Sequence, residues 1–376
     1  MRVASFHVVP VALSATKGSG ERISRKEGTK REILWGARMV GLRTKIRQWI
    51  GPFTQSRAAT GLRKLLREIQ PDLIHAMRIP FEGMLAASAL EGAGNKDIYL
   101  KRIPLLISVW GNDFTLHAPS TPFMRRYTRR TLRRVDGLHT DCRRDLRLAP
   151  IWGFSESKLA VVLPGAGGVQ PEIFHPPRHL QRHAKENAPP LVINPRGFRA
   201  YIRNDTFFRS IPLVLKSNPR VHFICPAMAD EVQARRWVVE LDIGRAVTLL
   251  SHQSRSQMAD LFRKSCIAVS PSTHDGTPNT LLEAMACGCF PIAGNLESLR
   301  EWITPGKNGF LISPDDPHDL AAAILRAIGT PELLRGAESQ NLHLIREQAL
   351  YPQVMARARA FYQDLIYELG RSGQSS

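Results

Sequence analysis

The chain has 376 residues, a length typical of two domains, and 43% of them are hydrophobic, which is enough for real cores. No apolar run approaches the roughly 20 residues that a membrane-spanning helix needs, and the five cysteines lack paired spacing. The composition therefore argues against a membrane-spanning protein and a disulfide scaffold, and it favours a reducing compartment. The formal net charge is +19, and residues 1–188 carry most of it, with 32 lysines and arginines against 15 acids.

The first half of the chain becomes readable from about residue 60. Residues 1–60 are polar and basic, with one candidate strand in 3–13. An amphipathic helix then ends at Pro71. The predicted elements that follow alternate: a strand at 73–76, a helix at 82–94, a buried strand at 103–110 that runs into a Gly-Asn-Asp turn, a helix at 125–135, a strand near 137–140, and a strand at 158–163 that ends in a glycine loop.

The second half repeats this alternation after a polar, proline-rich linker at 175–190. Six further strand–helix pairs are predicted between residue 191 and residue 328. Alternating strands and helices indicate parallel sheets that are covered on both faces. Two such series predict two doubly wound, Rossmann-like α/β domains that face a cleft, with ligands outside the carboxyl ends of the strands.

A dense basic patch lies at Met124–Arg134, and Arg143, Arg144 and Arg147 follow it. Spacings of three and four place much of this arginine on one helix face. Such a face is either simply solvated, or it binds an anionic membrane surface or acceptor, or it binds nucleic acid. Aromatic residues make up only 7% of the chain and no nucleic-acid motif accompanies the patch, so we expect no nucleic-acid partner.

The stretch "HDGTPNTLLEAMACG" at 274–288 carries the most chemical information. A strand, a Gly/Pro loop and a helix start form a phosphate-binding geometry, and we expect Thr277, Asn279 or Thr280 to cap this helix. Glu283 lies one turn into the helix, opposite the apolar stripe, where it can accept hydrogen bonds from the ribose hydroxyls of a nucleotide. Asp275 lies where a sugar would sit. The alternative is that Asp275 only forms a turn and that Glu283 is a solvated surface residue.

Residues Ser270–Ile324 closely resemble the donor-binding region of retaining glycosyltransferases of family four, which have the GT-B fold. The family has a Glu-x7-Glu signature, and this chain has Asp275 in the first place and Glu283 in the second. The family binds the donor diphosphate with an arginine and a lysine from one segment. Arg196 matches that arginine, whereas the position of the lysine is taken by Ile202, which lies between two arginines. The resemblance thus implies a donor site made of Arg196, Arg199, Arg203, Gly276, Thr277, Pro278, Asn279, Thr280 and Glu283, with Asp275 at the sugar.

The resemblance is less complete in the first half of the chain. Residues Ser108–Phe114, "SVWGNDF", are similar to the family's acceptor-side turn, with Trp110 where a histidine is often found and Asp113 retained as a second catalytic candidate. We find no counterpart of the family's first strand, Gly-Gly loop and helix, so we expect an incomplete N-terminal domain. The family's organisation implies an N-terminal acceptor-side domain at 1–180, a donor domain at 181–350, and a crossover helix and tail at 351–376.

The implied reaction is retaining transfer of a hexose from a nucleotide diphosphate sugar to a glycan or a lipid-linked glycan, in the synthesis of a cell-surface polysaccharide or glycoconjugate. No Asp-x-Asp motif lies at a strand end, so we expect neither a metal nor another cofactor. The expected location is the cytoplasm, with an anionic membrane surface contacted through the region Arg125–Arg147 on the inner face of the membrane. The alternative, favoured by Trp110 and the missing first unit, is a catalytically impaired subunit that binds nucleotide sugar or glycan.

Overall fold

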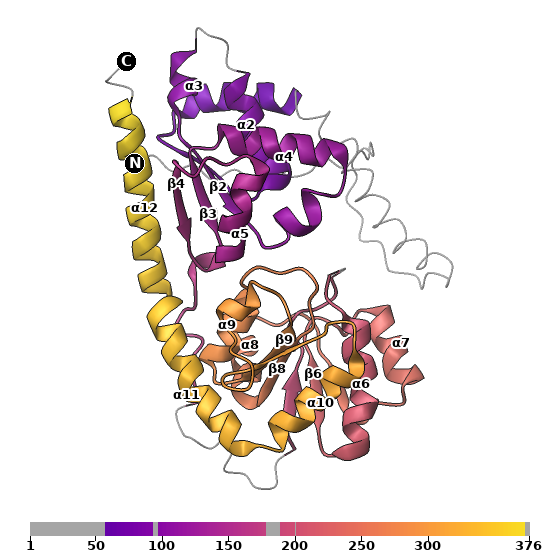
Figure 1. Cartoon of the computed structure of the whole chain (residues 1–376). Coiled ribbons are helices and arrows are strands. Elements are labelled where there is room, and N and C mark those ends of the chain that lie inside the picture. Colours follow the sequence, from indigo (N-terminus) through magenta and orange to yellow (C-terminus); the bar gives the residue numbers. More distant parts are fainter. Residues whose placement is uncertain (1–56, 93–96, 178–188, 200, 373–376) are drawn as a thin grey trace, which may run out of the picture.

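The computed structural model describes residues 57–92, 97–177, 189–199 and 201–372. These residues form two α/β units with one parallel sheet each, as predicted, and a long C-terminal helix that runs alongside the N-terminal sheet (Figure 1). The predicted strand in 3–13 and the predicted loss of the first unit concern residues outside these ranges. The predicted domain boundary at 180 also lies outside them.

The N-terminal sheet has four parallel strands in the order β1-β2-β3-β4. Residues 57–69 form a helix ahead of them. The elements are β1 (Ile74–Ala76), η1 (Ile79–Gly83), α2 (Met84–Glu91), α3 (Ile98–Arg102), β2 (Leu105–Val109), η2 (Asp113–His117), α4 (Pro122–Arg134), β3 (Gly137–Thr140), α5 (Arg143–Leu148), η3 (Ala149–Trp152), β4 (Leu159–Val162) and η4 (Gly165–Gly167).

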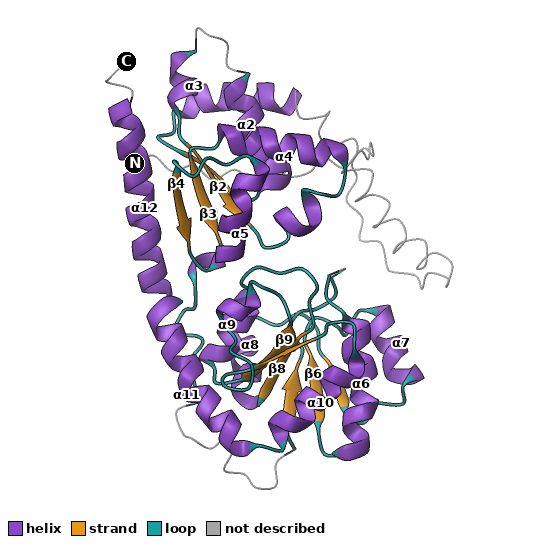
Figure 2. Ribbon diagram, viewed as in Figure 1, coloured by secondary structure: helices purple, strands orange, loops and turns teal. Residues whose placement is uncertain are grey.

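The C-terminal sheet has six parallel strands in the order β10-β9-β8-β5-β6-β7, and helices cover both of its faces (Figure 2). The elements are β5 (Leu191–Ile193), α6 (Asn204–Ser217), β6 (His222–Cys225), α7 (Val232–Glu240), β7 (Val247–Leu249), α8 (Arg255–Lys264), β8 (Ile267–Ser270), α9 (Asn279–Ala286), β9 (Phe290–Gly294), η5 (Leu299–Glu301), β10 (Phe310–Ile312), α10 (Pro317–Ile328), α11 (Pro331–Gln348) and α12 (Tyr351–Ser372).

Apolar side chains on both faces hold each sheet in place. Every residue of β2, β8 and β9 is buried, as expected for central strands covered on both sides. In the C-terminal unit, one core lies under α6, α7 and α10, and a second lies under α8, α9 and α11. Strands of this kind end in loops at the same edge of the sheet, which brings the loop after β8 close to the loop after β5.

Helix α12 belongs to the C-terminal end of the chain but packs on the N-terminal sheet. Phe361 and Leu365 are buried against Leu106 in a small apolar cluster. Gly137 permits this approach, because a Cβ atom there would lie 2.8 Å from a methyl group of Leu365. The interdomain connector is the chain between β4 and β5, and main-chain hydrogen bonds join it to the start of α12. Val169 N donates to Ala349 O over 2.7 Å. The two segments that pass from one unit to the other, the connector and the start of α12, therefore lie side by side.

Candidate functional site

Three of the predicted site residues meet where the loop between β8 and α9 lies beside the loop after β5. A carboxylate oxygen of Asp275 lies 2.7 Å from Nη2 of Arg196, and Nη1 of Arg196 donates to Oγ1 of Thr280 over 3.0 Å. Both charged side chains are almost buried. Burial raises the pKa of Asp275, and the charge of Arg196 opposes that rise. Asp275 and Arg196 thus form a nearly buried ion pair at the start of α9.

The N-terminus of α9 is open, contrary to our expectation of a side-chain cap. The residue before the helix is Pro278, and no side chain caps the first turn. Thr277 does not cap because its hydroxyl accepts a hydrogen bond from Nε1 of Trp302 over 2.9 Å, and the hydroxyl of Thr280 faces Arg196. The N–H groups of Asn279 and Thr280 have no partner within the helix, so they can bind an anion.

Segment 201–203 is tied to the same loop by main-chain contacts. Ile202, at the lysine place of the resembled family, is buried and forms an isolated bridge with Ser272. Arg203 turns away and pairs with Asp205 over 2.7 Å and with Asp315. Arg199 is exposed, donates to the hydroxyl of Tyr201 over 3.0 Å, and its charge opposes the rise in the pKa of Asp275. Of the two flanking arginines, Arg199 therefore remains the more suitable diphosphate ligand.

Glu283 faces the interdomain connector rather than bulk solvent. Its carboxylate lies 3.3 Å from Nη2 of Arg255, whose Nη1 donates to the side chain of Gln170 over 3.0 Å. Burial raises the pKa of Glu283, and Arg255 opposes the rise. Glu283 is therefore held near the interdomain connector, one turn from the anion-binding end of α9.

Asp113 does not have the environment of a residue that contacts substrate. It is 1% exposed, and its carboxylate accepts hydrogen bonds from Arg78 Nη2, from Ile79 N and from Trp110 N over 3.0 to 3.2 Å. These donors fix the turn after β2. The Trp110 side chain is 49% exposed and lies under the guanidinium of Arg78. Asp113 thus fixes the turn after β2 that carries Trp110.

Arg144 connects the turn after β2 to the loop between β8 and α9. The sequence analysis placed this arginine in the basic surface patch and therefore missed its role. Its guanidinium donates to Gly111 O over 2.6 Å, to Asp275 O over 2.8 Å and to Ser298 Oγ over 3.2 Å. Ser298 Oγ donates in turn to Asp275 O over 2.7 Å. Arg144 therefore fixes the main chain of Asp275 against the turn after β2.

Around this contact the two units meet closely. A Cβ atom on Gly111 would overlap the backbone of Gly276, and a Cβ atom on Gly276 would overlap the carboxylate of Asp141. Glu301 accepts hydrogen bonds from the N–H groups of Arg143 and Arg144, so a carboxylate of the C-terminal unit closes the N-terminus of α5. These contacts describe a closed arrangement of the two units.

Asp141, Cys142 and Asp145 form an acidic cluster whose possible ligand atoms lie within 4.8 Å of one another. Asp145 pairs with Arg144 over 2.8 Å, so a guanidinium already supplies the positive charge that a metal ion would bring. Burial and the neighbouring charge of Asp145 raise the pKa of Asp141 to about 8. The cluster therefore fits a neutral acid beside an ion pair better than a cation site.

Two family profiles match the chain. Residues 197–330 match the profile "Glycosyl transferases group 1", and residues 3–165 match "Glycosyl transferase 4-like domain". A D-inositol 3-phosphate glycosyltransferase of Stackebrandtia nassauensis is 27% identical over 193 residues, which cover 47% of this chain and 42% of that protein. An uncharacterized glycosyltransferase of Methanocaldococcus jannaschii is 29% identical over 119 residues, 32% of this chain and 34% of that protein. The matches span less than half the length of these relatives.

Solved structures share the fold. Sucrose-phosphate synthase from Thermosynechococcus elongatus superposes with a TM-score of 0.70 at 18% identity, over 84% of this chain and 79% of that chain. Anabaena HepE, solved in complex with UDP and glucose, superposes with a TM-score of 0.66 at 14% identity, over 81% of each chain. The predicted GT-B fold, with two Rossmann-like units, is thereby confirmed.

Proposed function

The chain belongs to the group 1 glycosyltransferases, and we therefore propose that it transfers a hexose from a nucleotide diphosphate sugar to a hydroxyl of a glycan or lipid-linked glycan, with the anomeric configuration retained. The observation that carries this proposal is the pair of Asp275 and Arg196 at the uncapped end of α9. A carboxylate for sugar hydroxyls and a guanidinium for phosphate lie there within one hydrogen bond of each other.

In this proposal the leaving nucleoside diphosphate is held by Arg196 and Arg199 and by the N–H groups at the start of α9. These donors are fixed before the reaction, so they stabilise the charge that develops on the leaving group without reorganising. Glu283 accepts hydrogen bonds from the ribose hydroxyls. Arg144 holds the main chain of Asp275 in register, and Asp113 holds the acceptor-side turn. No step in this scheme calls for a metal ion.

The basic face of α4 is the proposed contact with an anionic membrane. Arg125, Arg126 and Arg133 are exposed, and among the described residues they form no ion pair. The contact region is narrower than the predicted span Arg125–Arg147, because Arg144 is buried and Arg147 pairs with Glu297. Each basic residue near an anionic surface contributes about 1 kcal/mol. Among the described residues no helix is long and apolar enough to span a membrane.

A thermal-shift screen with nucleoside diphosphates and their hexose conjugates tests the donor half of the proposal. A ligand present at 100 times its dissociation constant stabilises the fold by about 2.7 kcal/mol. One nucleotide should raise the melting temperature, and the Arg196→Gln variant should lose that shift. If no nucleotide sugar or nucleoside diphosphate raises the melting temperature, the proposed donor site is wrong.

A second candidate is a nucleotide-sugar or glycan binding subunit with impaired catalysis. The buried, fully bonded carboxylate of Asp113 and the exposed Trp110 in the histidine place favour it. Release of nucleoside diphosphate from the stabilising nucleotide sugar, with and without a glycan acceptor, separates the two candidates. Turnover supports the transferase, whereas binding without release under all acceptor conditions supports the binding subunit.

A further inference from the structure

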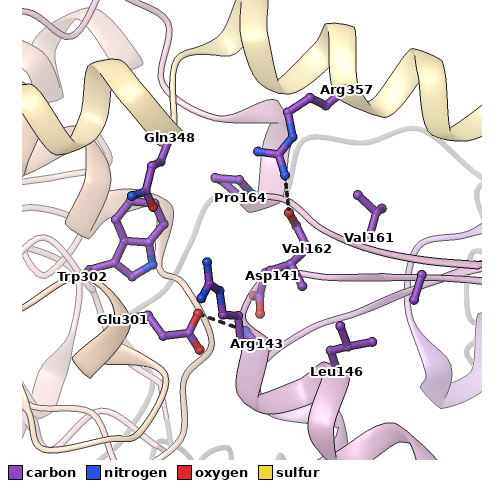
Figure 3. A pocket seen from close by; sticks show the side chains of 11 residues that line it. Asp141, Arg143, Leu146, Val161, Val162, Pro164, Glu301, Trp302, Gln348 and Arg357 are labelled. Carbon is purple, nitrogen blue, oxygen red and sulfur yellow. Dashed lines mark hydrogen bonds between the residues drawn. The ribbon is translucent and has the colours of Figure 1, made fainter. Parts of the chain in front are cut away.

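A cavity of about 660 Å³ lies between β4, α5, η5 and the start of α12 (Figure 3). Its walls come from the N-terminal unit, the C-terminal unit and the crossover helix. None of the predicted donor-site residues lines it. The volume suits a small molecule, and a cleft with convergent polar groups is a default place to look for one. The residues that decide its chemistry are Asp141, Arg143, Glu301, Trp302 and Arg357.

Two guanidinium groups supply positive charge to this cavity. The Arg143 side chain points into it, and among the described residues it forms no ion pair (Figure 3). Arg357, from α12, donates a long hydrogen bond of 3.3 Å to the carbonyl oxygen of Val162, and it forms no ion pair with any residue that the structure describes. Because a carbonyl oxygen carries no net charge, the charge of Arg357 is also left for a ligand.

The two acids of the cavity offset this positive charge only in part. The Glu301 carboxylate already accepts hydrogen bonds from the N–H groups of Arg143 over 3.0 Å and Arg144 over 3.2 Å, at the positive end of α5. Asp141 has a pKa raised to about 8 by burial and by Asp145, so it is mostly neutral at pH 7. One carboxyl oxygen of Asp141 is buried without a hydrogen-bond partner. Two arginines against one charged acid, Glu301, thus leave the lining with a net positive charge.

We propose that this cavity binds a small phosphorylated polyol or sugar, with its phosphate between Arg143 and Arg357 and its hydroxyl groups towards Asp141. Paired guanidinium groups bind phosphate oxygens through several charge-assisted hydrogen bonds. The hydroxyl groups of the ligand form hydrogen bonds with the carboxyl group of Asp141, which lines the cavity. Trp302 supplies an apolar wall beside them.

The cavity adjoins the proposed donor site on one side. The Asp141 carboxylate packs against Gly276, the residue after Asp275, and Trp302 donates to Thr277 of the same loop. A ligand in the cavity therefore contacts two residues, Asp141 and Trp302, that pack against the loop that would hold the donor sugar. Resting on the proposed function, this position places the ligand beside the donor site, where its binding also joins the two units and α12.

Calorimetric titration with glucose 6-phosphate, glycerol 3-phosphate, glucose and inorganic phosphate tests the site on the full chain. At least one phosphate ester should bind more tightly than both glucose and inorganic phosphate. Arg143→Gln and Arg357→Gln should each weaken that binding about 10-fold or more, because each removes a charged hydrogen-bond donor. Arg359→Gln, on the same helix but outside the cavity, should leave it unchanged.

If neither ester binds, or if glucose binds as tightly as the esters do, the proposal is wrong. Inorganic phosphate that binds as tightly as both esters shows a bare anion site and also overturns it. The thermal shift produced by a nucleoside diphosphate should persist in both arginine variants, since neither residue belongs to the donor loop. A persisting nucleotide shift with no ester binding therefore refutes this site alone, whereas ester binding without any nucleotide shift refutes the donor proposal alone.

Discussion

Nη1 of Arg144 donates a hydrogen bond to the main-chain carbonyl of Asp275 over 2.8 Å, across the boundary between the two units. The same guanidinium reaches Gly111 O in the turn after β2. One buried side chain therefore joins the turn that carries Trp110 and Asp113 to the loop that carries Asp275. Arg144 thus couples closure of the units to placement of the Asp275 main chain.

Arg144→Lys is expected to lower the transfer rate by about 100-fold while nucleoside diphosphate binding stays near the wild-type value. Lysine keeps the charge beside Asp145, but an ammonium cannot satisfy Gly111, Asp275 and Ser298 together. A loop displaced by about 1 Å can cost that much in rate. The lost hydrogen bonds should lower the free energy of unfolding by about 1–3 kcal/mol, measured by denaturant titration.

Arg147→Gln is the matched control for Arg144→Lys. Arg147 lies on the same short helix and also faces the other unit, but its pair with Glu297 is largely exposed. Surface pairs of this kind contribute less than about 1 kcal/mol, so stability and transfer should change little. If Arg144→Lys transfers sugar at the wild-type rate, Arg144 does not position Asp275.

Asp275→Asn is expected to abolish measurable transfer without weakening nucleoside diphosphate binding. The amide keeps the shape of the side chain but frees Arg196 from its competing carboxylate, so phosphate affinity should not fall. Loss of one partner of a nearly buried pair should cost roughly 3 kcal/mol of stability. Arg196→Gln, by contrast, should weaken nucleotide binding, as titration calorimetry can measure. Reduced nucleotide affinity in Asp275→Asn would contradict this division of roles.

Glu283→Ala is expected to weaken nucleotide binding by about 1–3 kcal/mol, because two ribose hydroxyls lose a carboxylate acceptor. The structural cost should be small, since its partner Arg255 has a side chain that is about half exposed. Glu240→Ala, in an exposed pair with Arg236, is the control and should leave affinity unchanged. The same affinity for a ribonucleotide and its 2′-deoxy analogue in the wild type would argue against the ribose contact.

The sequence predicts local relationships well and long-range ones poorly in this protein. The alternation of strands and helices, and the Asp275–Glu283 spacing at the start of α9, depend on neighbours in the chain, so periodicity and motif identify them. The acceptors of Arg144 lie 33, 131 and 154 residues away in the sequence, and its own helix places it among surface arginines. The pairing of Arg203 with Asp315 is hidden for the same reason.

A partly buried chain of hydrogen bonds crosses the N-terminal sheet and makes stability depend on pH. His75 Nδ1 lies 2.8 Å from the Tyr362 hydroxyl, and its Nε2 lies 2.8 Å from Ser108 Oγ, which lies 2.7 Å from His139 Nδ1. His139 Nε2 lies 3.0 Å from the carbonyl oxygen of Leu163, which can only accept. With both imidazoles neutral, every donor then has one acceptor, from the tyrosine hydroxyl to Leu163. A proton added to either histidine breaks this pattern.

Burial and the charge of His139 lower the pKa of His75 to about 4, from an ordinary value near 6.5. As the pH falls, the unfolded chain binds this proton at a higher pH than the folded chain does. Neutral His75 therefore contributes roughly 3 kcal/mol to the free energy of unfolding above pH 6.5, and this contribution is lost as the pH falls towards 4. His75→Gln, which cannot titrate, should reduce the rise in unfolding free energy between pH 4 and 6.5, measured by urea titration at each pH. Tyr362→Phe should lower stability by about 1 kcal/mol at every pH and keep the slope. An unchanged slope in His75→Gln would show that the charge on His75 does not govern acid stability.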